Sequence, residues 1–212
     1  MLINQNTLNP KAPNFKAKIR FSQGAYNKLD LRTMAKEGRY IGSPWLMEDS
    51  KILKEGFSNE ASICTIGFIK PQGAQEGYLF HSFPRSNPFD KVKEIIIPVI
   101  RKFRETGNPL EGILVGANFE HKKSLEQAKN FMGLFDEFGV QYSAFLAQRP
   151  YENPFNYRLR TDYPRVDMFV SAPKDEYIIS SSFEPILFDD PAKFKDRFVF
   201  VKKAPQDTIV FE

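Results

Sequence analysis

Apolar and polar residues follow patterns along the chain that predict strands in its first half. Residues 15–21 alternate cleanly between apolar and basic side chains, which is typical of a half-buried strand. Residues 62–69 and 77–83 are rich in β-branched and aromatic residues, and the connection between them contains Pro71 and Gly73. This pattern predicts a β-hairpin. Residues 42–56 show no clear period and predict a loop with at most a short strand.

Apolar residues recur at helical spacing in three further stretches. Residues 26–36 predict a short helix ending near Gly38. A longer helix is predicted to begin at residue 88 and to end at Gly107, with Pro98 inside it, where a proline kinks or divides a helix. The clearest helix covers residues 122–138, because its apolar residues form one stripe and Gly139 can end it.

Short apolar runs complete the predicted elements. Strands are expected at residues 112–119 and 140–147, followed by a run of antiparallel strands at residues 166–171, 176–182, 197–202 and 208–211. The predicted fold class is α+β, with mixed or antiparallel β-sheets and at least two flanking helices. Residues 1–14 are polar and contain two prolines, so we expect a mobile arm there. Residues 15–212 are predicted to form a single domain.

Composition narrows the class of protein. Of 212 residues, 42% are hydrophobic and 26% are charged, as in ordinary globular domains. No run of about 18 apolar residues occurs, so we expect no membrane insertion. Without a secretory signal, and with one cysteine that excludes an intrachain disulfide, a cytoplasmic location is expected. One cysteine and two histidines also argue against a zinc site, and the net charge of +4 favours no class of partner.

The predicted hairpin carries the candidate chemistry, Cys64 and His81. If the turn is centred on Gln72 and Gly73, residue 64 faces residue 81, with Cβ atoms about 4.5–5.5 Å apart. A thiol nucleophile needs at least a cysteine and an adjacent base that accepts its proton. The alternative is that Cys64 is a buried, inert small hydrophobe, as strand cysteines usually are, and that His81 is a packed or surface residue.

Residues 148–165 differ in character, with four arginines, three prolines and four aromatic residues. A long loop in a compact domain is often functional, so these residues could wall a substrate groove. Arg149, Arg158 and Arg160 are the candidate substrate-binding residues. Basic residues between aromatic ones can also bind single-stranded nucleic acid, which we consider the less favoured alternative. An ordinary surface loop with arginines lying along apolar surface is the other interpretation.

Several short motifs in residues 58–148 together resemble one family. Cys64 precedes His81 by 17 residues, and His81 opens the motif HSFP. A helix with a proline at Pro98 follows, and then a strand ending in VGANF around Gly116. In this order and spacing the chain resembles the chemoreceptor glutamine deamidase (CheD) family, which is related in fold to the deamidase domain of cytotoxic necrotizing factor. It departs from the family in having Ile63 where a glycine usually precedes the cysteine.

The resemblance implies a function and a set of site residues. The expected reaction is hydrolysis of a protein glutamine side chain, in a chemotaxis setting, with Cys64 as nucleophile and His81 as base. The third catalytic position of the family, a threonine, is Ser58 here. In an extended strand six residues span about 20 Å, so Ser58 can reach His81 only if the chain bends near residues 59–60. No cofactor is implied, and the implied partner is a protein substrate. A non-catalytic relative that only binds a protein is the alternative.

Overall fold

The computed structural model describes residues 17–21, 31–41, 48–61, 63–84, 89–118, 121–147, 166–181, 198–205 and 207–211. Two six-stranded mixed β-sheets and three helices make up these residues. The predicted α+β class, with mixed sheets and at least two flanking helices, is therefore confirmed. The predicted mobile arm, residues 1–14, lies outside the described residues.

The two sheets, which we call A and B, each combine strands from both ends of the chain. In sheet A the strand order is β12 (Thr208–Phe211), β1 (Lys18–Phe21), β10 (Glu176–Ser181), β9 (Val166–Ser171), β4 (Glu55–Ala61) and β2 (Tyr40–Ile41). In sheet B it is β11 (Phe198–Lys202), β8 (Gln141–Ala147), β7 (Leu110–Asn118), β5 (Thr65–Pro71), β6 (Gly77–Ser82) and β3 (Glu48–Leu53). Sheet B thus takes β3 and β11 from outside residues 58–148.

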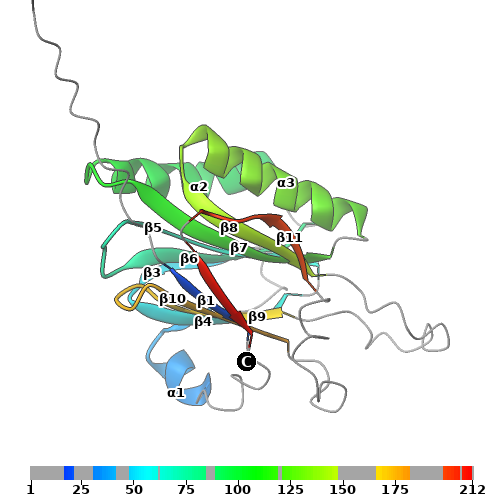
Figure 1. Cartoon of the computed structure of the whole chain (residues 1–212), viewed down its shortest axis with the longest axis horizontal. Coiled ribbons are helices and arrows are strands. Elements are labelled where there is room, and N and C mark those ends of the chain that lie inside the picture. Colours follow the sequence, from blue (N-terminus) through cyan, green and yellow to red (C-terminus); the bar gives the residue numbers. More distant parts are fainter. Residues whose placement is uncertain are drawn as a thin grey trace, which may run out of the picture.

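The elements stack in layers (Figure 1). Helices α2 (Phe89–Arg104) and α3 (Lys122–Glu137) cover one face of sheet B, sheet A lies against the other face, and α1 (Leu31–Lys36) lies beyond sheet A. Both faces of sheet B are therefore covered, and every residue of β5 and of β6 is buried. Along β5, Ile66 and Phe68 face sheet A, whereas Ile69 faces the helices. Burial on both faces explains why these strands read as continuous apolar runs.

Three predictions about the elements need correction. The four late strands do not form one antiparallel run, because β11 pairs with β8 in sheet B and β12 pairs parallel to β1 in sheet A. Of the two effects expected of Pro98, a kink or a division, the division is excluded, because helix α2 continues through it; the side chain at position 98 is exposed. Residues 42–56, predicted as mostly loop, contain β3 and the start of β4. Among the described residues no helix is long and apolar enough to cross a membrane.

The hairpin is present, but its register differs from the prediction. Ala74 N–H donates to Pro71 O at 3.0 Å, and Gly73 has a φ of 73°. These contacts form a four-residue turn in which Gly73 takes the position that requires positive φ. Gln75 and Glu76 then lengthen the connection, and the ladder pairs Ile66 with His81 and Phe68 with Leu79. Moving the turn centre by one residue shifts each pairing by two, so Cys64 does not face His81.

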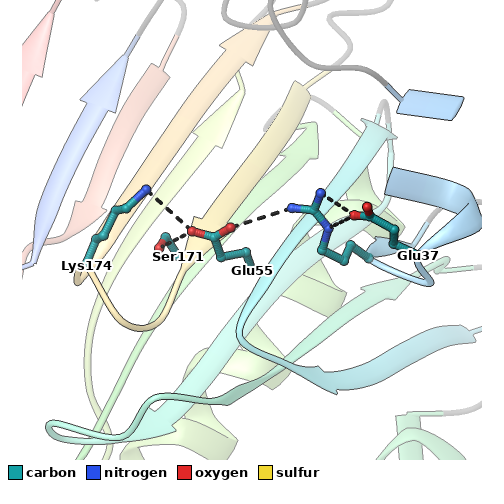
Figure 2. A network of polar contacts seen from close by, with 5 residues as sticks. Glu37, Glu55, Ser171 and Lys174 are labelled. Carbon is teal, nitrogen blue, oxygen red and sulfur yellow. Dashed lines mark hydrogen bonds and ion pairs between the residues drawn. The ribbon is translucent and has the colours of Figure 1, made fainter. Parts of the chain in front are cut away.

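A chain of surface ion pairs joins the turn between α1 and β2 to β4 and to the turn after β9 (Figure 2). Glu55 accepts from Ser171 Oγ at 3.0 Å and lies 3.5 Å from Lys174 Nζ. Arg39 Nη1 lies 3.6 Å from the same carboxylate, and Arg39 Nε donates to Glu37 at 2.6 Å. Because these charged side chains are partly exposed to solvent, each pair contributes little stability, at most about 1 kcal/mol.

Candidate functional site

The two sheets bring His81 and Ser58 together. His81 is on β6 of sheet B, and its ring points towards sheet A, where Ser58 lies on β4. Ser58 Oγ and His81 Nδ1 are 2.9 Å apart, a hydrogen bond whose donor depends on the histidine tautomer. Both side chains are buried, at 0% and 3% exposure. The contact that the catalytic assignment of Ser58 requires is therefore present.

A bulge in β4 gives Ser58 its position. Ser58 pairs with Met168 and Ala61 with Val166 on β9, so three steps along β4 correspond to two along its partner. The extra residue lies at positions 59–60, where a bend was predicted. Such a bulge turns the following strand out of line. Asn59 is held there, because Tyr40 Oη donates to Asn59 Oδ1 at 2.7 Å.

Cys64 lies directly before β5 and belongs to the core between the sheets, with 1% exposure. It is two residues before Ile66, the residue that pairs with His81. Diagonal neighbours in a regular antiparallel ladder are about 7–8 Å apart, so the thiol and the imidazole share one layer without being opposed. Among the described contacts, no hydrogen bond joins the two side chains. The direct opposition predicted from sequence is wrong.

Burial keeps both groups neutral near pH 7. It raises the pKa of the Cys64 thiol to about 12, although the backbone of Ile63 lowers it in part by hydrogen bonding. Burial likewise lowers the pKa of His81 to about 4. His81 Nε2 is buried and has no hydrogen-bond partner in the described part of the chain. The imidazole is therefore neutral, with one nitrogen held by Ser58 and the other contacted by no hydrogen-bonding group of the described residues.

Two residues that sequence reasoning did not single out hold the backbone at Cys64. Ser124 Oγ, in the first turn of α3, donates to Ile63 O at 2.6 Å. Gly116, at the end of β7, has a φ of 104°, and a Cβ there would lie 2.6 Å from Cys64 O. Only glycine tolerates both this dihedral angle and this close approach. The GAN motif could have suggested the role of Gly116, but no sequence signal marked Ser124.

The site is closed. Cys64 and His81 are 1% and 3% exposed. A void of about 10 Å³ next to β6 lies on the other, helix-facing side of sheet B, because Tyr78, Phe80 and α2 line it. A larger surface cavity of about 510 Å³ lies near the other end of β3, where Arg39, Leu53 and Glu55 help to line it. It is remote from the Cys64–His81 end and does not serve that site. No cluster of metal-ligating side chains occurs among the described residues.

Arg149, Arg158 and Arg160, the predicted substrate-binding residues, lie outside the described residues. In comparisons with known proteins, no family model matches the chain and no curated protein matches it significantly. The resemblance to chemoreceptor glutamine deamidases therefore stays a prediction that rests on the motifs and their spacing.

Replacing Ser58 by alanine will destabilise the protein by about 1–3 kcal/mol, because the buried Nδ1 of His81 then lacks its hydrogen-bond partner. Urea unfolding at neutral pH measures the change. Ser171→Ala is the matched control, since that hydroxyl is also buried in sheet A but bonds the half-exposed Glu55. If the two variants lose the same unfolding free energy, the hydrogen bond to His81 contributes no more than that to Glu55.

Proposed function

We propose that this protein is a cytoplasmic, thiol-dependent amidohydrolase that deamidates glutamine side chains of a protein substrate. The observation that carries the proposal is the hydrogen bond of 2.9 Å between Ser58 and His81 Nδ1. It orients a neutral imidazole in the same layer as Cys64. When Nδ1–H donates to Ser58 Oγ, Nε2 is the unprotonated nitrogen and can accept a proton, and no described residue hydrogen-bonds to it. This is the arrangement of a base and its orienting group in nucleophilic acyl transfer.

The proposed reaction has two steps, the formation of a thioester on Cys64 and its hydrolysis. His81 accepts the thiol proton as Cys64 Sγ attacks the amide carbon, and the proton then passes to the leaving nitrogen as the C–N bond breaks. The products are a thioester and ammonia. Water, deprotonated by the same imidazole, adds to the thioester, and the C–S bond breaks to release the carboxylate and return the thiol. Cys64 supplies the nucleophile of the first step, His81 transfers the protons, and water is the only other reactant besides the substrate. No cofactor takes part.

The resting site must open before this chemistry can begin. Cys64 and His81 are 1% and 3% exposed, so a side-chain amide of a substrate does not reach them in this arrangement. Substrate binding therefore has to displace the residues around Ile63, which Ser124 holds. Opening also brings water to the site, and this lowers the pKa of the thiol by relieving the burial that raises it.

A second candidate function rests on the burial of Cys64. A thiol with 1% exposure and a pKa of about 12 is inert in the resting protein. These properties favour a non-catalytic relative that binds a partner protein and keeps Cys64 as a core residue. In that case the hydrogen bond between Ser58 and His81 is only structural.

The test is a search for deamidated glutamine in a pool of folded bacterial proteins incubated with the purified chain. Conversion of an amide into an acid adds about one dalton to a peptide, which mass spectrometry detects and locates. We expect sites that appear with the wild type and are absent with Cys64→Ala. His81→Gln should lower the rate by roughly 100- to 10,000-fold, the usual contribution of a general base.

Ser58 supplies the graded control. Ser58→Ala should slow the reaction, whereas Ser58→Thr, which keeps a hydroxyl group, should retain more of the activity. Sites that form equally with Cys64→Ala would exclude the thiol as nucleophile. If no site forms with the wild type, and the chain retains a partner protein whether or not Cys64 is present, the non-catalytic candidate replaces the enzyme.

A further inference from the structure

A second group of buried ionisable residues lies at the opposite end of the layer between the sheets. Lys70 of β5 and Glu111 of β7 are paired in the ladder of sheet B, with Lys70 Nζ 2.9 Å from Glu111 Oε1. Their side chains are 0% and 2% exposed. Lys70 also binds Asp175 and the carbonyl of Ala172, both in the turn between β9 and β10 of sheet A. The ammonium group therefore links the two sheets.

Asp207 forms a second link beside the first. It lies just before β12 of sheet A, and its carboxyl group accepts from Ser143 Oγ on β8 of sheet B. Ala204 N–H donates to the same Ser143 Oγ at 3.1 Å. Tyr177, on β10, is fully buried, and burial, followed by the charges of Glu111 and Asp207, raises the pKa of its hydroxyl group. Asp207 itself is 4% exposed.

The charges in this group do not balance. Three carboxyl groups, Glu111, Asp175 and Asp207, face one buried ammonium, that of Lys70; Lys203, which also acts on Asp207, is exposed. Asp175 is 42% exposed, so water and Lys70 together can stabilise its negative charge. Glu111 and Asp207 have only the remaining positive charge of Lys70 as a buried counter-charge, inside a layer from which water is largely excluded. A buried carboxylate without a full counter-charge is costly, so its neutral form is favoured.

Unfilled hydrogen-bond positions lead to the same conclusion. Oε2 of Glu111, Oδ1 of Asp207 and Oη of Tyr177 are buried and without a hydrogen-bond partner among the described residues, whereas Oε1 of Glu111 contacts Lys70 Nζ at 2.9 Å. A carboxylate can only accept hydrogen bonds, whereas a protonated carboxyl group can also donate one. Protons on Glu111 and Asp207 therefore supply the donors that this group of oxygen atoms lacks.

We propose that Lys70, Glu111, Asp207 and Tyr177 form a proton-dependent clasp between the two sheets. The clasp is tight when Glu111 and Asp207 are protonated and loosens when both ionise. Burial, the largest cause, raises the pKa of Glu111 to about 7, and the negative charges of Asp175 and Asp207 raise it further against the opposing effect of Lys70. Burial raises the pKa of Asp207 to about 6, with Ser143 and Lys203 acting in the opposite direction. The clasp does not depend on any reaction at Cys64.

The sign of the pH effect follows from these shifts. Both folded pKa values lie above the ordinary values of 4.5 and 3.8. At a pH between the ordinary pKa and the folded pKa of a group, that carboxyl group is protonated in the folded state and ionised in the unfolded state. Each group therefore stabilises the fold fully below its ordinary pKa, and this stability is lost as the pH rises through about 7 for Glu111 and about 6 for Asp207.

Urea unfolding at about pH 5 and about pH 7 tests the clasp, with the full chain as wild type, Glu111→Gln and Asp207→Asn. Between these pH values the unfolding equilibrium constant of the wild type should rise roughly 40-fold more than that of Glu111→Gln, and roughly 10-fold more than that of Asp207→Asn. His81 titrates in the same range in all three proteins, so its contribution cancels. Glu55→Gln, a half-exposed carboxyl group of sheet A, is the control and should keep the wild-type dependence.

Identical pH dependences in the wild type and both cluster variants would overturn the proposal. Should a variant fail to fold, ¹³C NMR of the carboxyl groups in the wild type decides instead. At least one buried carboxyl group should then titrate above about pH 5.5, and titration of every carboxyl group below about pH 5 would overturn the proposal. Neither result depends on whether the protein deamidates glutamine.

Discussion

In the folded protein Cys64 will react with iodoacetamide about a thousandfold more slowly than in urea at the same pH, near 8. Only the thiolate reacts, and burial raises the pKa of this thiol from 9.0 to about 12. The fraction of thiolate near pH 8 falls by about the same factor, and the closed site slows the reaction further. Intact mass reports on this side chain alone, because the chain has one cysteine.

The labelling rate of a Ser124→Ala variant is compared with that of the wild type, because Ser124 hydrogen-bonds to the carbonyl of Ile63, the residue before Cys64. Its loss should accelerate labelling of the folded protein if this contact keeps the thiol covered. Labelling of the wild type at the rate found in urea would show that the closed arrangement is not the resting state in solution. Protection alone does not separate the enzyme from the non-catalytic candidate; the deamidation experiment does.

Acidification will weaken the fold through His81 by about 3 kcal/mol relative to a His81→Asn variant. Burial lowers the pKa of His81 from 6.5 to about 4. Between about pH 6.5 and about pH 4, the His81 imidazole therefore binds a proton in the unfolded state but not in the folded state. The stability that the neutral imidazole contributes is fully present above pH 6.5 and is lost as the pH falls through about 4. Asparagine keeps a polar partner for Ser58 but does not titrate.

The measurement is the difference in unfolding free energy between wild type and variant, taken in urea from about pH 7 to about pH 4. Taking the difference removes the opposing contributions of Glu111 and Asp207, which both proteins share. NMR titration of the His81 ring gives its pKa directly. A value above about 6, or a difference that does not change with pH, would contradict a buried neutral imidazole.

Much of the fold was predictable because the signals are local. The helix at residues 122–138 was predicted almost to its observed bounds, since its apolar stripe and Gly139 depend only on neighbouring residues. The strands at residues 166–171 and 208–211 were predicted to the residue. The turn at Gly73 was recognised as a turn, but whether one or two further residues belong to it depends on packing. That uncertainty misplaced Cys64 relative to His81.

The candidate site was predictable as a set of residues and less so as a geometry. Cys64 and His81 were chosen for their chemistry, and Ser58 for the spacing of a family motif. The bend at residues 59–60 was required by chain length and appears as a bulge. No sequence signal pointed to Ser124, because its contact with Ile63 joins residues 61 positions apart. The cluster around Lys70 was missed for the same reason.

The sequence by itself determined where most of the helices and strands form, although not β3 or the start of β4, and that one thiol and one imidazole lie at or beside the same hairpin. Period, turn residues and composition suffice for this, because they act through neighbours along the chain. Only the tertiary structure decided the hairpin register, the assignment of each late strand to its sheet, and the meeting of Ser58 with His81. It also decided that these groups are buried, and burial sets their pKa values. Those properties depend on which surfaces cover one another, and distant parts of the chain supply the covering.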